Sequence, residues 1–482
     1  MASNTHAWRH VFKPAGLLVP AGVAVPELPQ DFTKQPHVSD IALHNTIAEE
    51  GAAPYMALQT DAAAAECRHA YCQSVARRID LDTPATTETA AASDFVCIVL
   101  ISGCVDPHDE RPDARRVPWD SVVVVGDRTR QYPVALFATD LPRFTGIYPG
   151  AVVGIRGAVL KRDASTMRPR DVAVNEVIHP SIPRPAYGPG GAAPTGPGGV
   201  RIMVACGPYP AGGETLQSAV MKIYSIAQHR GAQMVVIAGP YITAPTPGKV
   251  QTEQVNRRNI ENMVNEVVTQ SGRTPDRKCR AVFMPALDDI SCVPVMPQLP
   301  SVCFDEFDSA AVDVTASNPC EFTVAGALRI GVCNYDAIAL LRGAQLDRGL
   351  PPDASIRQVC HSIARSGVYA PVVDGHERVS DIKHLDRLAF GAAAAKATGA
   401  PATVPTPPHV MVYPNRSFSS PLAQTIGGEG GPLFVSFANG SDKSVAVLEL
   451  TIADVERAAR GGCTHENGVS AGIIDLVLNE IA

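Results

Sequence analysis

The sequence has no long apolar run, no block of like charge and no C-x-x-C pair of cysteines. Its longest apolar run, residues 95–105, is well short of the roughly 18–20 residues that a membrane helix needs. The N-terminus also lacks the charged start and clean apolar region of a secretory signal. We therefore expect a soluble intracellular protein with no membrane segment.

The charge balance and the cysteines exclude two further classes. Lys+Arg number 41 against 48 Asp+Glu, so the net charge of −7 argues against a strong basic field over the whole surface, although a locally basic groove remains compatible. None of the 12 cysteines lies in a C-x-x-C pair, and Cys97, Cys206 and Cys333 lie inside apolar runs. This usage predicts buried free thiols in a reducing compartment rather than a disulfide framework.

Local composition and hydrophobic pattern divide the chain into segments. With 482 residues and 45% hydrophobic composition, the chain is long enough for roughly two to four domains. The expected segments are an extended or partly disordered lead-in (1–53), a helix and connection (54–93), a barrel (94–179), a Pro/Gly linker (180–199), an α/β domain (200–460), and a tail with a possible last helix (461–482).

Two fold predictions follow from the strand-like runs. Five short β-branched runs in residues 94–179, separated by polar or glycine-bearing turns, predict a small barrel. The oligonucleotide/oligosaccharide-binding (OB) barrel is the commonest five-stranded form. From residue 200 strands alternate with amphipathic helices, and later with other strands across a turn at Gly326, which predicts a layered α/β sandwich with mixed sheets.

A layered α/β domain of this size can be a metallophosphoesterase, in which His, Asp and Asn hold two metal ions at the carboxyl ends of several strands. The positions where such ligands are expected carry other residues or lack their partners: Cys206, Gly207, Tyr209, Gly239, Pro240, Asp288, Asp289, His409 and Asn415. Only one position offers carboxylates, so we expect no metal site and no cofactor. Asp288 and Asp289 are interpreted as a turn or helix cap, and His409 as a structural residue.

Other catalytic patterns are also weak. The sequence around Ser470 matches the G-x-S-x-G elbow, but no histidine follows it in the chain to complete a triad. Cys360 and His361 are neighbours on an expected helix and point apart. We expect no catalytic residue.

The positions without ligands occur in an order that resembles the B subunits of the eukaryotic replicative DNA polymerases. The resemblance runs over residues 54–452. It rests on the motifs Val204-Ala205-Cys206-Gly207-Pro208-Tyr209, Ile237-Ala238-Gly239-Pro240-Tyr241, Phe283-Met284-Pro285-Ala286-Leu287-Asp288-Asp289, Pro294-Val295-Met296-Pro297-Gln298-Leu299-Pro300, Asn318-Pro319-Cys320-Glu321-Phe322, and Pro408-His409-Val410-Met411-Val412-Tyr413-Pro414. The first and fourth of these favour the alpha type within the family.

The resemblance implies a non-catalytic nuclear scaffold. It implies an OB barrel joined to a calcineurin-like phosphoesterase domain without metal ligands. The partners implied are the zinc-containing C-terminal region of the polymerase alpha catalytic subunit and, through the complex, primase, in support of RNA–DNA primer synthesis. DNA would be met mainly indirectly.

Three alternatives stay open. The first is a B subunit of the delta or epsilon type. The second, disfavoured by the ligand positions, is an active metal-dependent phosphodiesterase. The third is a single-stranded-DNA-binding barrel. The aromatic residues in the barrel region that could serve it are Trp119, Tyr132, Phe137, Phe144 and Tyr148.

Overall fold

The computed structural model describes a large part of the chain in separate stretches. They are residues 7–13, 41–45, 61–104, 117–123, 132–138, 146–185, 198–209, 213–241, 260, 262–267, 269, 279–289, 296–298, 300, 315–344, 352–371, 389–390, 406–415, 422–428, 430–438, 440 and 444–479. Of the expected linker, residues 186–197 lie outside this set.

The chain forms two compact units. The sandwich unit comprises residues 1–57, 184–336 and 391–482, and the barrel unit comprises residues 58–183 and 337–390. The second stretch of the barrel unit corrects the expected boundary, which placed it inside the 200–460 domain. The reason is that α7 (Pro352–Ser366) contacts the barrel side of the chain: the Arg78 guanidinium donates to the Arg365 carbonyl at 2.6 Å.

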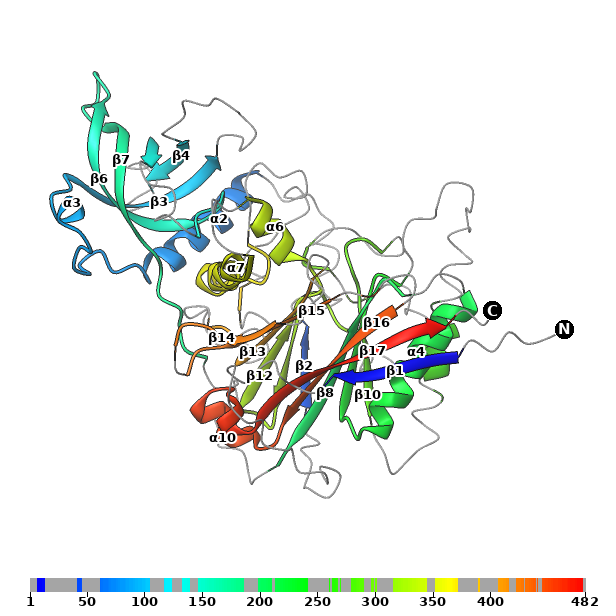
Figure 1. The fold of residues 1–482 in the computed structure, drawn as a ribbon. Coiled ribbons are helices and arrows are strands. Elements are labelled where there is room, and N and C mark those ends of the chain that lie inside the picture. Colours follow the sequence, from blue (N-terminus) through cyan, green and yellow to red (C-terminus); the bar gives the residue numbers. More distant parts are fainter. Residues whose placement is uncertain are drawn as a thin grey trace, which may run out of the picture. The chain divides into compact units, whose positions relative to one another are not determined.

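The sandwich unit contains two six-stranded sheets (Figure 1). In order across the sheet, the first consists of β1 (Ala7–Lys13), β17 (Val469–Asn479), β16 (Ser444–Ile452), β8 (Val200–Cys206), β9 (Met234–Ala238) and β10 (Arg280–Met284). The second consists of β14 (Leu422–Thr425), β15 (Leu433–Ala438), β13 (Val410–Asn415), β12 (Leu328–Val332), β11 (Cys320–Val324) and β2 (Ile41–Asn45). Strands β8, β9 and β10 are parallel, as are β12, β13 and β15, and the other pairs are antiparallel. The prediction of mixed sheets is confirmed.

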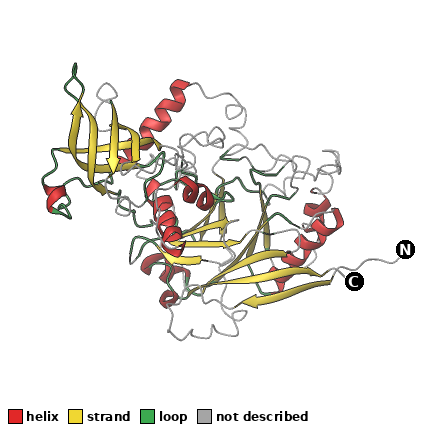
Figure 2. Ribbon diagram, turned by 45° about the horizontal axis from the view of Figure 1, so that its top comes forward, coloured by secondary structure: helices red, strands yellow, loops and turns green. Residues whose placement is uncertain are grey.

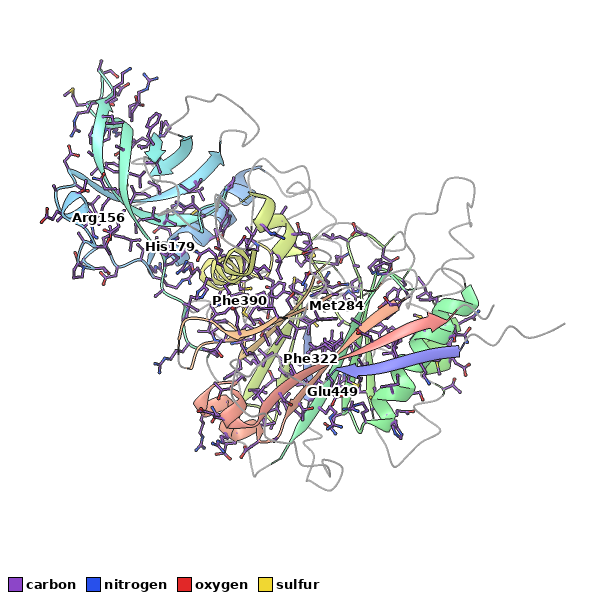
Figure 3. All side chains as sticks on the ribbon, in the orientation of Figure 1. Arg156, His179, Met284, Phe322, Phe390 and Glu449 are labelled. Carbon is purple, nitrogen blue, oxygen red and sulfur yellow. The ribbon has the colours of Figure 1, made fainter. Side chains whose placement is uncertain are left out.

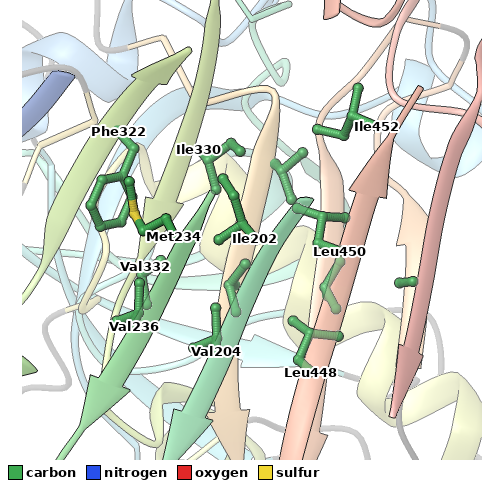
Figure 4. Packing of buried hydrophobic residues seen from close by; sticks show 14 of the residues in the cluster. Ile202, Val204, Met234, Val236, Phe322, Ile330, Val332, Leu448, Leu450 and Ile452 are labelled. Atoms are coloured by element: carbon green, nitrogen blue, oxygen red, sulfur yellow. The ribbon is translucent and has the colours of Figure 1, made fainter. Parts of the chain in front are cut away.

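One hydrophobic core lies between the two sheets (Figure 4). Because side chains alternate along a strand, Ile202 and Val204 of β8 face it together with Phe322 of β11 and Ile330 of β12. Figure 3 labels Phe322 and Met284, which belong to the same core. Each such side chain is almost fully buried, and burying a Val, Ile or Phe contributes about 1.5–3 kcal/mol.

A second apolar cluster covers the outer face of the first sheet. The intervening residues of β8 and β9, such as Met203 and Val235, pack there against α4 (Gly213–His229) and a further helical stretch that includes Ile260 and Val264 (Figure 2). The first sheet is therefore buried on both faces, which explains why its strands read as continuous apolar runs.

The barrel unit is built on a closed five-stranded barrel, as predicted. Its strands are β3 (Phe95–Cys104), β4 (Val117–Val123), β5 (Pro133–Ala138), β7 (Pro169–Ile178) and β6 (Val152–Arg162), in that order around the barrel. Helix α2 (Asp61–Ala76) packs on it through Cys72 and Val75, which contact the cluster of Ile98, Leu100 and Val152. The short helix α3 (Glu88–Ala91) begins at Thr87, whose side chain accepts from the Ala90 N–H. Among the residues that the structure describes, the other helices of this unit are α6 (Ala337–Ala344) and α7.

A buried ion pair fixes the connection between α2 and the barrel. Arg156 on β6 lies 2.5 Å from the Glu176 carboxylate on β7 and donates to the Leu81 carbonyl at 2.7 Å (Figure 3). The Thr86 N–H donates to the same carboxylate at 3.1 Å. Burial alone would raise the pKa of Glu176, but the hydrogen bonds from Thr86 and Arg156 outweigh it and leave that pKa below its ordinary value.

The C-terminal end of the chain corrects the sequence-based expectation, while the described residues of the N-terminal segment are extended, as expected. The tail expected to contain a helix forms β17, and the lead-in expected to be extended or partly disordered contributes β1 and β2 to the two sheets. Residues of β17 face both apolar clusters, Ile473 one and Ile474 the other, so its sequence is apolar on consecutive positions. Such a short run cannot be told from a helix by periodicity. Helix α10 (Val455–Gly461), capped by Asp454, was not predicted.

The cysteines and the helices bear on two other expectations. The cysteines whose side chains the structure describes are free, and all of these except Cys97 are buried; they are Cys72, Cys97, Cys206, Cys279, Cys320, Cys333, Cys360 and Cys463. Burial raises the pKa of Cys97, Cys279 and Cys463 to about 12, so these thiols stay protonated at neutral pH. Among the helices that the structure describes, none combines the length and the apolarity required to cross a bilayer.

Candidate functional site at the carboxyl ends of the central strands

The carboxyl ends of the parallel strands of both sheets meet at one end of the sandwich unit. We call these residues the carboxyl edge: 206–209 after β8, 238–241 after β9, 285–289 after β10, 333–334 after β12, and Asn415 at the end of β13. Asn334 joins the two sheets there, because its side-chain amide donates to the Gly239 carbonyl at 2.9 Å and to the Pro285 carbonyl at 3.0 Å. Open α/β sheets bind ligands at such an edge, so the structure brings the expected ligand positions other than His409 to one place.

A repeated Gly-Pro-Tyr sequence closes the ends of β8 and β9. The Tyr209 hydroxyl lies 3.3 Å from the Ala205 carbonyl on its own strand and donates to the Ala238 carbonyl on β9 at 2.9 Å. The Tyr241 hydroxyl repeats this one strand further along, reaching the Ile237 carbonyl at 2.7 Å and the Met284 carbonyl on β10 at 3.0 Å. Each tyrosine hydroxyl therefore lies between a carbonyl of the strand that precedes it in the chain and a carbonyl of the neighbouring strand, and it connects the two strand ends.

The two tyrosine side chains also pack against each other. The Tyr209 and Tyr241 rings stack with centroids 6.2 Å apart and planes 10° apart. Both residues are buried. Burial, together with Cys206, raises the pKa of Tyr209 well above its ordinary value, so its hydroxyl remains a proton donor.

The glycines of the repeat allow the backbone turns to approach closely. A Cβ atom on Gly207 would lie 2.1 Å from the Pro240 carbonyl oxygen, and one on Gly239 would lie 3.2 Å from the Asp289 carboxylate. The peptide bonds to Pro208 and Pro240 are both cis. No residue with a side chain fits at Gly207 without moving the neighbouring backbone.

The adjacent carboxylates behave differently from a general acid/base pair. Asp289 is buried, and its carboxylate accepts from the Tyr241 N–H at 2.6 Å. It thereby ties the turn after β10 to the turn after β9. Asp288 is more exposed. The interpretation of these residues as a turn agrees with the hydrogen bond from the Asp289 N–H to the Ala286 carbonyl at 3.2 Å.

A buried amide network lies behind these turns. The Asn318 side chain donates to the Gln298 side-chain oxygen at 2.8 Å and to the Asn334 carbonyl at 3.0 Å, and accepts from the Asn334 N–H at 2.9 Å. Gln298 and Asn318 also exchange backbone hydrogen bonds at 2.7 and 3.0 Å. Sequence reasoning quoted Gln298 and Asn318 only as parts of motifs and missed Asn334, although its place directly after an apolar strand of the right length was a usable signal.

The structure separates His409 from the other predicted positions. His409 precedes β13 and Asn415 ends it, so the two lie at opposite ends of one strand. The His409 Nδ1 accepts from the Arg329 N–H at 3.1 Å, and burial, with Arg329, lowers the pKa of His409 to about 4. Asn415 donates to the Ser436 hydroxyl at 2.6 Å. His409 is a neutral structural residue of the far end of the sheet.

The polar side chains of the carboxyl edge form hydrogen bonds within the protein, and we call this arrangement a closed seam. The Tyr209 and Tyr241 hydroxyls, the Asn334 amide and the Asp289 carboxylate bond to backbone groups, and the Asn415 amide bonds to the Ser436 hydroxyl. Within the described residues, no three His, Cys, Asp or Glu side chains come together in a way that could hold a metal ion. Burial raises the pKa of Cys206, so its thiol is protonated and weakly nucleophilic.

Comparison with known proteins relates the chain to one family. Residues 202–420, which contain the whole carboxyl edge, match the family of B subunits of DNA polymerases alpha and epsilon. The B subunit of DNA polymerase alpha from Mus musculus is 24% identical over 273 residues, which are 53% of this chain and 41% of that protein. The protein of the same name from Rattus norvegicus is 24% identical over 278 residues, which are 54% of this chain and 42% of that protein.

These matches span about two fifths of the length of the curated relatives. The family match includes the Gly-Pro-Tyr repeat, Gln298, Asn318 and Asn334. The resemblance of the chain to the B subunits of replicative DNA polymerases is thus confirmed over residues 202–420.

Proposed function

We propose that this protein is a non-catalytic accessory subunit of a replicative DNA polymerase of the alpha type. In this role it binds the zinc-containing C-terminal region of the catalytic subunit and, through the assembled complex, supports primase in RNA–DNA primer synthesis in the nucleus. Support comes from the family match over residues 202–420 and from the two relatives named as B subunits of DNA polymerase alpha.

The proposal extends to the fold of both units. We assign the barrel to the OB type, because it is a closed five-stranded barrel in which the fourth and fifth strands exchange places in the spatial order. We assign the sandwich unit to the calcineurin-like phosphoesterase type, because two mixed sheets enclose one core and parallel strands deliver their carboxyl ends to one edge.

The observation that carries the non-catalytic assignment is the state of the carboxyl edge. A two-metal phosphoesterase needs oxygen and imidazole donors that point toward the ions. Here Tyr209, Tyr241, Asp289 and Asn334 direct their polar atoms to backbone groups of neighbouring strands. Because its polar side chains hold the strand ends together, the carboxyl edge is suited to serve as a rigid surface on which another protein binds.

The test is co-expression of the full chain with the C-terminal regions of the alpha, delta and epsilon catalytic subunits, followed by size-exclusion chromatography. Co-elution with the alpha region only is the expected result. Co-elution with the delta or epsilon region instead would overturn the alpha assignment and keep the accessory role. Failure with all three, from a folded preparation, would overturn the scaffold role.

The phosphodiesterase alternative has its own decisive measurement. Purified protein is incubated with Mn²⁺, passed through a desalting column and assayed for bound metal, beside an Asp288→Ala/Asp289→Ala variant. We expect no retained metal in either protein. Two ions retained per chain by the wild type and lost in the variant would overturn the non-catalytic assignment.

A further inference from the structure

The hairpin formed by β6 and β7 concentrates positive charge at its tip. We define the basic hairpin as residues 160–171. Its charged residues are Lys161, Arg162, Arg168 and Arg170, against Asp163 and Asp171. All four cationic residues are exposed, and β6 and β7 extend beyond the other strands of the barrel (Figure 1). The hairpin is therefore locally positive, although the chain as a whole has a net charge of −7.

One of these arginines, Arg168, lies beside an aromatic ring. The Arg168 guanidinium carbon lies 5.2 Å from the centroid of the Tyr132 ring. Burial raises the pKa of Tyr132 and Cys97 raises it further, while Arg168 and Arg162 both act in the opposite direction. In the described part of the chain neither arginine has a carboxylate within ion-pair distance. Tyr132 itself is partly exposed.

The turn of the hairpin is held rigidly. The Asp163 carboxylate accepts from the backbone N–H groups of Ser165 and Thr166 at 3.0 and 2.8 Å and from their hydroxyls at 2.6 and 3.0 Å. These bonds hold the pKa of Asp163 below its usual range. Asp163 thus serves the turn, while its neighbour Arg162 donates to the Met167 carbonyl at 3.3 Å.

Met167 at the tip is exposed in an unusual backbone conformation. Its φ is 56°, in the region that favours glycine, and the residue is 65% exposed. The Met167 N–H donates to the Asp163 carbonyl at 2.9 Å, which maintains this conformation. A large apolar side chain therefore projects into solvent next to the arginines.

We propose that the basic hairpin, with Tyr132, binds single-stranded nucleic acid. Arg162 and Arg168 bind backbone phosphates, with Lys161 and Arg170 adding charge along the hairpin. A base stacks on the Tyr132 ring, beside which the Arg168 guanidinium also lies. Proteins that bind single strands without sequence preference combine such a basic track with aromatic faces. This contact is independent of the accessory role proposed above.

The cluster favours nucleic acid over an acidic polypeptide. Both ligands would supply negative charge to Arg162 and Arg168, but a nucleic acid also supplies flat bases that stack on a partly exposed aromatic ring. Of the other aromatic residues considered from the sequence, Tyr148 is buried and Phe144 lies outside the described residues. Tyr132 is the aromatic side chain on which the contact is tested.

The experiment measures fluorescence anisotropy of a labelled oligothymidine of about 16 nucleotides with the full chain at several salt concentrations. We expect binding that weakens with salt. Each lost phosphate contact on a single strand reduces the slope of log K against log [salt] by about 0.7, so Arg162→Ala/Arg168→Ala reduces it by about 1.4. Tyr132→Leu lowers affinity by about fivefold or more with an unchanged slope, because stacking releases no counterions.

The matched control removes the same charge elsewhere. Arg457→Ala/Arg460→Ala deletes two exposed arginines on α10, and it is expected to leave both affinity and slope unchanged. A loss as large as that of the hairpin variant, or no oligothymidine binding by the wild type at low salt, would overturn the proposal. Binding of polyglutamate but not oligothymidine, abolished by the hairpin variant, would also overturn it and assign the surface to an acidic protein segment.

Discussion

The carboxyl edge of the sandwich unit and the basic hairpin of the barrel unit use polar side chains in opposite ways. At the edge, Asn334 and Tyr241 give their hydrogen bonds to backbone carbonyls of adjacent strands. At the hairpin, Arg168 has a ring as its neighbour and Arg170 is 64% exposed in its side chain. Polar groups of the first kind hold the protein together, while those of the second kind are available to another molecule.

The same contrast holds for whole charges. Inside the sandwich unit, Arg329 on β12 lies 2.9 Å from the Glu321 carboxylate on β11, with side chains only 4% and 1% exposed. Arg329 also donates to the Thr406 hydroxyl at 3.1 Å. In the hairpin the pair of Arg170 and Asp171 is 3.8 Å apart and open to water, where such pairs contribute about 0–1 kcal/mol. The comparison predicts large effects on stability from inward-facing groups and small ones from outward-facing groups.

The largest expected effect is from Glu321→Gln. The substitution keeps the shape of the side chain but leaves the Arg329 charge buried without a carboxylate. Removing one partner of a buried ion pair costs about 3–5 kcal/mol. Urea unfolding of the sandwich unit, followed by near-ultraviolet circular dichroism in the full chain, measures the loss.

The double variant Glu321→Met/Arg329→Met is the control for this prediction. Replacing both charges by apolar side chains removes the uncompensated cation, so it should recover most of the stability lost by Glu321→Gln. If Glu321→Gln costs less than about 1 kcal/mol, the pair behaves as a surface pair and the contrast with the hairpin fails.

The next effect is expected from Asn334→Ala. Two buried backbone carbonyls, those of Gly239 and Pro285, lose a donor, and unsatisfied buried groups cost about 1–3 kcal/mol each. We therefore expect a loss of about 2–4 kcal/mol in the free energy of unfolding. Asn467→Ala is matched to it, because the Asn467 amide also donates to a carbonyl, that of Gly462 at 2.8 Å, but at a partly exposed site.

The matched variant should cost about 1 kcal/mol or less. Equal losses from Asn334→Ala and Asn467→Ala would show that the carboxyl edge is no more dependent on its hydrogen bonds than the surface is. That outcome would remove the reason for treating the edge as a closed seam.

A third effect depends on pH. The pKa of His409 is lowered to about 4 in the folded protein, chiefly by burial and then by Arg329, while a hydrogen bond with the backbone of Ala459 acts in the opposite direction. The unfolded value is about 6.5. Between these values the unfolded chain binds a proton that the folded chain does not, so the free energy of unfolding falls as pH falls from about 6.5 to about 4 and is unaffected by this group above about 6.5.

His409→Asn isolates this contribution. An asparagine oxygen can still accept from the Arg329 N–H, and the other titrating groups are common to both proteins. The wild type should lose up to about 1.4 kcal/mol more per pH unit than the variant in that window. Parallel pH profiles from urea titrations would contradict the assignment of His409 as a buried neutral residue.

The features predicted correctly from the sequence are those that depend only on residues close together in the chain. The strand Met234–Ala238 has the predicted bounds, and the hairpin of β11 and β12 turns at Gly326, whose φ of 67° suits glycine. An apolar run of strand length and a glycine between two such runs are sufficient for these predictions.

Contacts between distant segments could not be predicted in this way. Asn334 bonds to carbonyls 95 and 49 positions away in the chain, and only the arrangement of the two sheets brings them together. The error at β17 has the same origin, since a strand buried on both faces has no polar alternation to identify it. The separation of His409 from Asn415 was predictable, because one precedes and the other ends the same strand.

The smallest effect on stability is expected from Arg162→Ala/Arg168→Ala in the hairpin. Exposed substitutions usually change the free energy of unfolding by less than about 0.5 kcal/mol. The contact of Arg168 with the Tyr132 ring adds about 0.5–1 kcal/mol at an exposed site, so the total loss should stay near 1 kcal/mol. Thermal and urea unfolding of the full chain measure it on the same samples used for nucleic-acid binding.

This measurement also decides how any loss of binding is interpreted. If the double variant is as unstable as Asn334→Ala, the arginines hold the barrel together, and the difference between inward-facing and outward-facing polar groups disappears. If the variant keeps its stability and loses its salt-dependent binding of oligothymidine, folding and binding rest on separate side chains. The exposed arginines would then contribute to recognition while contributing almost nothing to the fold, because water already solvates them in the free protein.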